Sequence, residues 1–78
     1  MPKKEKLKRV NAREAIKAFE CFGFEVRRTS GSHFILKKEG VPHLVSIPKH
    51  AGDVGVGLIE HHLKSVGLSN SDFNSVVN

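Results

Sequence analysis

Tryptophan and tyrosine are absent from this 78-residue chain, and cysteine occurs only once, as Cys21. A single cysteine cannot form an internal disulfide, which fits a reducing cytoplasm better than secretion. No segment approaches the roughly 18 to 20 apolar residues that a membrane-spanning helix needs. The first ten residues carry charges rather than an apolar run, so they do not resemble a signal peptide. We therefore expect a soluble, cytoplasmic protein that does not bind membranes.

The chain is also short. A domain of this size buries only about 60% of the surface that its unfolded chain exposes, so its core is thin. A single small domain has no room for a large cofactor cleft, and we expect no cofactor. Any chemistry must take place on a shallow surface.

Acidic residues are outnumbered by basic ones, and the formal net charge is +5. Residues 1–9 hold five basic residues and one acidic residue, and residues 26–50 repeat this ratio. Such clustering makes a polyanion the leading partner. The alternative is a solvated surface with a basic tail that binds nothing. We expect residues 1–9 to form a basic flexible arm and residues 10–78 to form the folded domain.

The pattern of apolar residues predicts a helix over residues 11–22. Asn11 and Glu14 form a start similar to a capping box, and Gly23 is a typical residue for the helix end. Between them, one face of the helix carries the apolar residues Ala15, Ile16, Phe19 and Phe22.

Three strands are predicted next, over residues 24–29, 33–38 and 41–47, with turns at 30–32 and 39–40. A second amphipathic helix begins at Val56 and ends at Gly67, and Ser69 caps a short last helix. This order predicts an α+β fold, α-β-β-β-α. Its three-stranded antiparallel sheet carries the helices on one face, and a short C-terminal helix follows.

The turn before the second predicted strand contains Gly31, Ser32 and His33. A histidine at the start of a strand is held by rigid backbone and can still face solvent. Its ordinary pKa near 6.5 allows proton transfer at neutral pH. Ribonuclease chemistry needs a base for the ribose 2′-hydroxyl and cations around the phosphorus, without a metal. The alternative is a structural histidine at a strand edge.

Several basic residues are candidates to bind RNA near His33. Arg27, Arg28, Lys37 and Lys38 lie on the first two predicted strands, and one of each pair is expected to face solvent. Lys49 and His50 follow the third strand, whose end should lie beside the His33 turn. Lys49 would hold a phosphate, and His50 would supply a second acid–base or phosphate contact. The alternatives are a charged sheet edge and an exposed loop.

The remaining histidines do not predict a metal site. His61 and His62 are neighbours on a predicted helix and therefore do not face the same way. No cysteine pair or His–Glu pattern accompanies them. His62 precedes the core position Leu63, so we expect it to be half-buried. Because most of the phenylalanines fall at core positions, we also expect no base-specific stacking surface.

The order of these motifs resembles the HicA (YcfA-like) family of messenger-RNA interferases. The resemblance covers about residues 10–73. Two of its motifs, Gly31-Ser32-His33 and Ile47-Pro48-Lys49-His50, lie between the two predicted amphipathic helices, and the third, Val66-Gly67-Leu68-Ser69, ends the second helix. It implies a fold similar to a double-stranded-RNA-binding domain. It also implies the toxin of a type II toxin–antitoxin system, which cleaves mRNA with His33 as the catalytic residue. Ser32, Arg27, Arg28, Lys37, Lys49 and His50 are then the expected RNA contacts.

The resemblance further implies a HicB-type antitoxin partner, with DNA contacted only indirectly through that antitoxin. The sequence departs from the family at Phe34, where many members have a second histidine, and at Gly57-Leu58, where a threonine is missing. The alternative function is a binding module of the same fold that holds RNA without cleaving it. A further alternative is a regulator that acts only with its partner.

Overall fold

A computed structural model describes residues 5–49 and 52–77 of the chain. Its elements are α1 (Ala12–Cys21), β1 (Glu25–Ser30), β2 (His33–Lys37), β3 (Val45–Pro48), α2 (Val56–Ser65) and α3 (Asn70–Ser75). This order confirms the predicted α-β-β-β-α fold with its short C-terminal helix, and it is compatible with the fold of double-stranded-RNA-binding domains.

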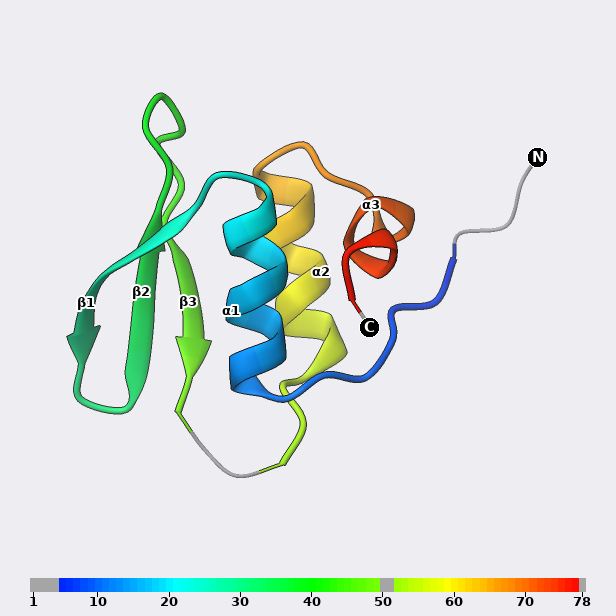
Figure 1. The fold of residues 1–78 in the computed structure, drawn as a ribbon, viewed down its shortest axis with the longest axis horizontal. Coiled ribbons are helices and arrows are strands. Elements are labelled where there is room, and N and C mark those ends of the chain that lie inside the picture. The colour runs from blue at the N-terminus through cyan, green and yellow to red at the C-terminus, as the bar shows by residue number, and fades with distance from the viewer. Residues whose placement is uncertain (1–4, 50–51, 78) are drawn as a thin grey trace.

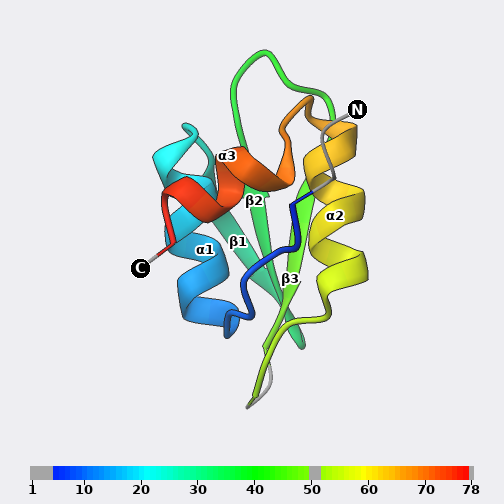
Figure 2. The ribbon, with the colours of Figure 1, turned by 90° about the vertical axis from the view of Figure 1, so that its right-hand side faces the viewer.

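The elements form three layers. The antiparallel sheet has the order β1-β2-β3, and α1 and α2 lie side by side on one of its faces (Figure 1). Viewed from the right-hand side of Figure 1, α3 crosses the outer surface of α1 and α2 (Figure 2). The opposite face of the sheet has no helix on it among the described residues.

Helix α1 begins with the capping box that the sequence predicts. The Glu14 backbone N–H donates to Asn11 Oδ1 over 2.8 Å, and the Asn11 backbone N–H donates to Glu14 Oε1 over 3.0 Å. These two bonds satisfy donors that a helix start otherwise leaves unpaired. The chain then turns at Gly23, whose φ of +94° lies in the region that favours glycine.

The third strand is shorter than predicted. We expected residues 41–47, whereas β3 spans Val45–Pro48. Pro42 has no backbone N–H to give to a ladder. The Val41 N–H instead bonds to the Lys38 carbonyl over 3.1 Å and closes a turn. The link from β2 to β3 is therefore a loop rather than a two-residue hairpin.

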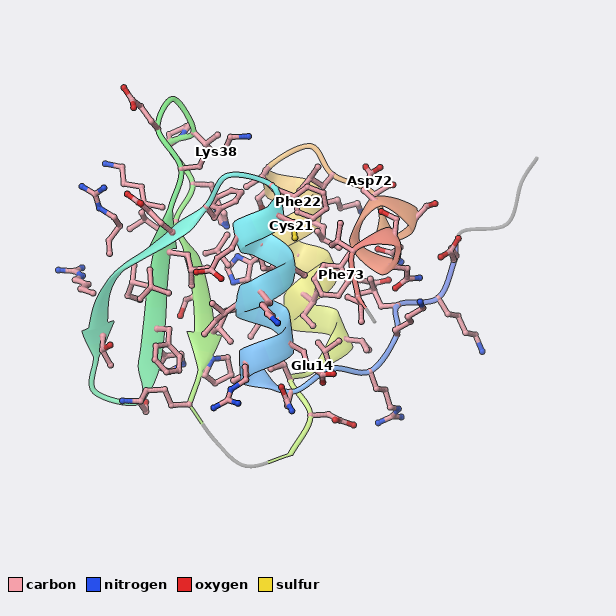
Figure 3. The ribbon with its side chains drawn as sticks, in the orientation of Figure 1. Glu14, Cys21, Phe22, Lys38, Asp72 and Phe73 are labelled. Carbon is pink, nitrogen blue, oxygen red and sulfur yellow. The ribbon has the colours of Figure 1, made fainter. Side chains whose placement is uncertain are left out.

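The core lies between the sheet and the helices and continues under α3. Phe19 of α1 is fully buried, and its ring centroid lies 5.7 Å from that of Phe24 and 5.8 Å from that of Phe73. Phe73 lies between α3 and the two longer helices (Figure 3). The rings of Phe19, Phe24 and Phe73 thus connect α1, the start of β1 and α3.

Two buried asparagines join α3 to the segment before α1. Asn74 Nδ2 donates to the Glu5 carboxylate over 2.6 Å and to the Lys6 carbonyl over 2.7 Å, and Asn74 Oδ1 accepts from the Lys8 N–H over 2.9 Å. Asn70 Nδ2 donates to the Glu5 carbonyl over 2.7 Å. We call residues 1–9, the predicted basic arm, the basic segment; its described part therefore lies against α3. Its flexibility stays a prediction.

The helices in the described ranges are short, at most ten residues each. None of them has the length and apolar character that crossing a membrane requires.

Candidate functional site

Four segments meet at one end of the sheet. Figure 1 shows the turn between β1 and β2, the end of β3 and the first turns of α1 and α2 at the same end of the molecule. The register pairs His33 with Ser30 on β1 and with Pro48 on β3. One more bond extends this ladder, because the Lys49 N–H donates to the Ser32 carbonyl over 2.6 Å.

His33 is exposed at this end and is held by its neighbour. The Ser32 hydroxyl lies 3.1 Å from His33 Nδ1. When Nδ1 carries the proton and donates to Ser32 Oγ, Nε2 is left as the basic nitrogen. Within residues 5–49 and 52–77, Nε2 has no hydrogen-bond partner. The ring is thus oriented through one nitrogen, while the other is available to a ligand.

A β-bulge sets the position of the arginines on β1. The register shifts between Val26 and Arg28, so that Arg28 pairs with Ile35 while Val26 pairs with Leu36. Directly opposed residues in an antiparallel pair point to the same face. Ile35 is two residues from His33 on β2, so Arg28 lies on the face of His33. Without the shift in register, Arg28 would pair with Phe34 and point to the helix-covered face.

Two more of the predicted strand cations, Arg27 and Lys37, lie further along the strands from His33. Arg27 is exposed, and its Nη1 forms an ion pair with Glu25 Oε1 over 2.6 Å. Lys37 is exposed at the opposite end of β2, four residues or about 13 Å along the strand from His33. The structure therefore groups Arg28 and Lys49 with the His33 turn, but not Arg27 or Lys37.

Lys49 lies on the other side of the turn from His33. Its ammonium nitrogen is 5.2 Å from the centroid of the Phe34 ring, within the range of a cation–π contact. Phe34 follows His33 on β2 and so points to the opposite face, toward the helices. It is half-buried rather than part of the closed core. His50 lies outside the described residues.

The sequence did not predict a groove that opens between α1 and β2. Its volume is about 590 Å³. The apolar lining comes from Ala12, Ile16 and Phe34, and the charged lining comes from Arg13, Lys17, Lys49 and Glu20. We call this feature the α1–β2 groove. Two features of the sequence indicate this groove. Arg13 and Lys17 are four residues apart and so share one face of α1, and Phe34 follows the outward-facing His33 and so points toward the helices.

A second group of histidines lies away from this end. His62 is only 5% exposed, a deeper burial than we expected. Its Nδ1 is 2.8 Å from His43 Nε2, and its Nε2 is 3.1 Å from the Ser46 carbonyl oxygen on the edge of β3. Burial lowers the pKa of His62, and the nearby His43 and His61 lower it further, against a raising effect of the Ser46 backbone.

These histidines do not form a metal centre. In the part of the chain that the structure describes, no three His, Cys, Asp or Glu side chains are arranged to hold an ion. Each ring nitrogen of His62 already faces another protein group. Instead, the His62 side chain of α2 bonds to the backbone of Ser46 at the free edge of β3.

Comparison with known families places the chain in a family of toxins. Residues 12–68 match the model of the family described as HicA toxin of bacterial toxin–antitoxin. The matched range extends from the start of α1 to just beyond α2 and includes the His33 turn. It leaves out α3 and the basic segment that α3 holds. The chain matches no curated protein and no solved structure.

Proposed function

Because the chain belongs to the HicA toxin family of bacterial toxin–antitoxin systems, we propose that it is an endoribonuclease that cleaves mRNA with His33 as the catalytic base. The observation that carries this proposal is the position of His33. It is exposed at the end of the sheet, its ring is oriented by the Ser32 hydroxyl 3.1 Å away, and Nε2 has no hydrogen-bond partner in the described ranges. A toxin with this activity would work in the cytoplasm, where mRNA is translated.

The proposed reaction begins at the ribose. His33 Nε2 takes the proton of a 2′-hydroxyl, and that oxygen forms a bond to the adjacent phosphorus. The bond from phosphorus to the 5′ oxygen of the next nucleotide then breaks, and this oxygen takes a proton from solvent. The products are a 2′,3′-cyclic phosphate and a 5′-hydroxyl. The attacking oxygen belongs to the RNA, so no bound metal is needed to generate a nucleophile.

Arg28 and Lys49 supply the positive charge that the reaction requires. The transition state carries extra negative charge on the phosphorus oxygens, and fixed cations stabilise it. Arg28 lies on the face of His33. The Lys49 backbone is bonded to Ser32, and its long side chain, whose ammonium lies over Phe34, would reach the phosphate from the other side of the turn. These cations contact phosphate rather than base edges, so they give affinity without sequence selectivity.

The products of cleavage test the proposed reaction. The purified protein should cut a labelled mRNA in the presence of EDTA and leave 2′,3′-cyclic phosphate ends. A substrate with a single 2′-deoxy nucleotide at a cut position should stay intact at that position and be cut elsewhere. Loss of cleavage in EDTA, or cleavage at the deoxy position, would refute the mechanism. Tight RNA binding without any cleavage would support the non-catalytic binding module instead.

The family also implies an antitoxin partner, and we infer that it is of the HicB type and covers the His33 turn. A shallow basic site in so short a chain cannot be closed by a lid of its own. An acidic partner surface would compete with RNA for the same cations, and a buried apolar anchor would slow its release. Contact with DNA would then come only through the antitoxin.

Hydrogen exchange tests this mode of inhibition. In the complex, the backbone of Ser30–Phe34 and residues 52–57 should exchange more slowly than in the free toxin, as should Lys37 and Lys49. If protection is confined to α3 and the outer side of α1, the antitoxin inhibits without covering the site.

A further inference from the structure

We propose that the α1–β2 groove holds one unpaired nucleotide of the RNA, next to the phosphodiester that is cleaved at His33. The inference rests on the proposed ribonuclease function and adds the substrate class: single-stranded RNA rather than duplex. It depends on three features of the groove, which are its charge, its aromatic lining and its place beside the His33 turn.

The charge of the groove fits an anion. Arg13 and Lys17 are one helical turn apart on α1, and Lys49 approaches from the end of β3. Within residues 5–49 and 52–77, no carboxylate lies within ion-pair distance of these three cations. Glu20 is the one acidic residue in the lining. The groove therefore has unneutralised positive charge to offer a phosphodiester backbone.

The apolar lining fits a base. Phe34 and Ile16 present apolar surface between the cations, and the Phe34 ring is half-buried, so part of its face is accessible. At present the Lys49 ammonium lies over that ring at 5.2 Å. A base that stacks on Phe34 would displace the ammonium, which would then be free to contact the phosphate of the same nucleotide. Every base has a π-face, so this contact requires no particular sequence.

The position of the groove limits the form of RNA that can reach it. His33 and Phe34 are consecutive on β2 and therefore point to opposite faces of the sheet. An RNA strand that contacts both must pass around the end of the sheet at the Ser30–His33 turn. A single strand can do so with one base turned out, whereas the bases of an A-form duplex are paired and stacked.

Binding of an uncleavable RNA tests the proposal independently of catalysis. The probe is a fluorescein-labelled 12-mer of mixed sequence with 2′-O-methyl at every position, used alone and annealed to its complement. Since it has no free 2′-hydroxyl, its affinity does not depend on whether His33 is a base. We expect the wild-type protein to bind the single strand at least about tenfold more tightly than the duplex, given the strength of base–aromatic stacking.

Variants of the groove identify the contact. Phe34→Leu keeps an apolar side chain but removes the ring, and it should weaken single-strand binding by about fivefold or more while leaving duplex binding unchanged. Lys17→Gln should weaken binding and reduce its salt dependence. Lys64→Gln removes the same charge from the exposed surface of α2 and is the matched control, with little change expected. Thermal unfolding checks that each variant is folded.

A readout that needs no variant covers the case in which Phe34→Leu does not fold. A 2-aminopurine placed in turn at each position of the 12-mer should report stacking at the groove in the wild-type complex, beyond what the free strand shows. Equal affinity for single strand and duplex, or equal effects of Phe34→Leu and Lys64→Gln, would overturn the proposal. So would groove variants that bind the 12-mer normally but escape a coexpressed antitoxin, which would assign the groove to the antitoxin.

Discussion

Acidification should destabilise this protein through one buried side chain, His62. Its imidazole is 5% exposed, and it joins α2 to the edge of β3 through Ser46 and to the β2–β3 loop through His43. A proton added to His62 would place a charge in a buried position beside two other histidines, His43 and His61. Burial is the largest cause that lowers the His62 pKa below its ordinary 6.5.

The sign of the effect follows from proton uptake. Above pH 6.5 His62 is neutral in both the folded and the unfolded chain, so it adds no pH dependence there. Below that pH the unfolded chain binds a proton that the folded chain does not, and the free energy of unfolding falls. The loss is complete once the pH drops below the lowered pKa of the folded state.

The magnitude scales with the pKa difference. Each unit of lowering is worth about 1.4 kcal/mol of unfolding free energy. In a domain of this size, one kcal/mol corresponds to about 4–8 °C in Tm. Urea unfolding from pH 8 to pH 5 would measure the slope. The variant His62→Gln keeps a side chain that can both donate to and accept from Ser46, but it cannot titrate. His61→Gln removes the exposed histidine that makes the smallest contribution to the lowered pKa of His62, and it is the control for the loss of a neighbouring histidine.

We expect the wild-type protein and His61→Gln to lose stability as the pH falls below 6.5, and His62→Gln to lose clearly less. If His62→Gln shows the same slope as the wild-type protein, His62 is not the group that titrates and the reasoning fails.

Two further predictions concern the basic segment and α3. Asn74→Ala should lower the unfolding free energy by about 1–3 kcal/mol, because it leaves the Lys8 N–H and the Lys6 carbonyl without their partner. Ser71→Ala on the exposed side of α3 is the control. An equal Tm for both variants would contradict the prediction. Replacing Lys3, Lys4 and Lys6 with glutamine keeps the backbone contacts of Glu5, Lys6 and Lys8 with α3. It should flatten the salt dependence of RNA binding by about 0.7 in log–log slope for each phosphate that the segment no longer neutralises. An unchanged slope would show that the segment does not touch RNA.

The sequence predicted the features of the fold that depend on local chemistry. The capping box at Asn11, the helix cap at Ser69 and the turn glycine at Gly23 are local signals, and the structure confirms each of them. The error at the third strand has a local cause as well, since Pro42 and Val41 favour a turn over a ladder. Strand boundaries are sensitive to such single residues.

Features of the site that depend on tertiary packing could not be predicted from the sequence. A single extra residue in β1 decides which face Arg28 occupies, and no pattern in Val26–Arg28 indicates the bulge. The contact of His62 with Ser46 depends on how α2 docks against β3. The partial exposure of Phe34 depends on the distance between α1 and β2, which no local pattern indicates. The sequence thus predicted the His33 turn and the position of Lys49 beside it, but not the bulge in β1 or the α1–β2 groove.

The rate of RNA cleavage by the purified His33→Ala variant is the most direct test of the proposed activity. His33 is exposed, and among the described residues its ring forms a hydrogen bond with Ser32 alone, so its removal should leave the Tm unchanged. His61→Ala removes another exposed histidine and serves as the control. The proposal predicts that His33→Ala cleaves about a hundredfold or more slowly, the usual scale for losing a general base, while His61→Ala cleaves at the wild-type rate. Equal rates for His33→Ala and the wild-type protein would contradict the assignment of His33 as the catalytic base.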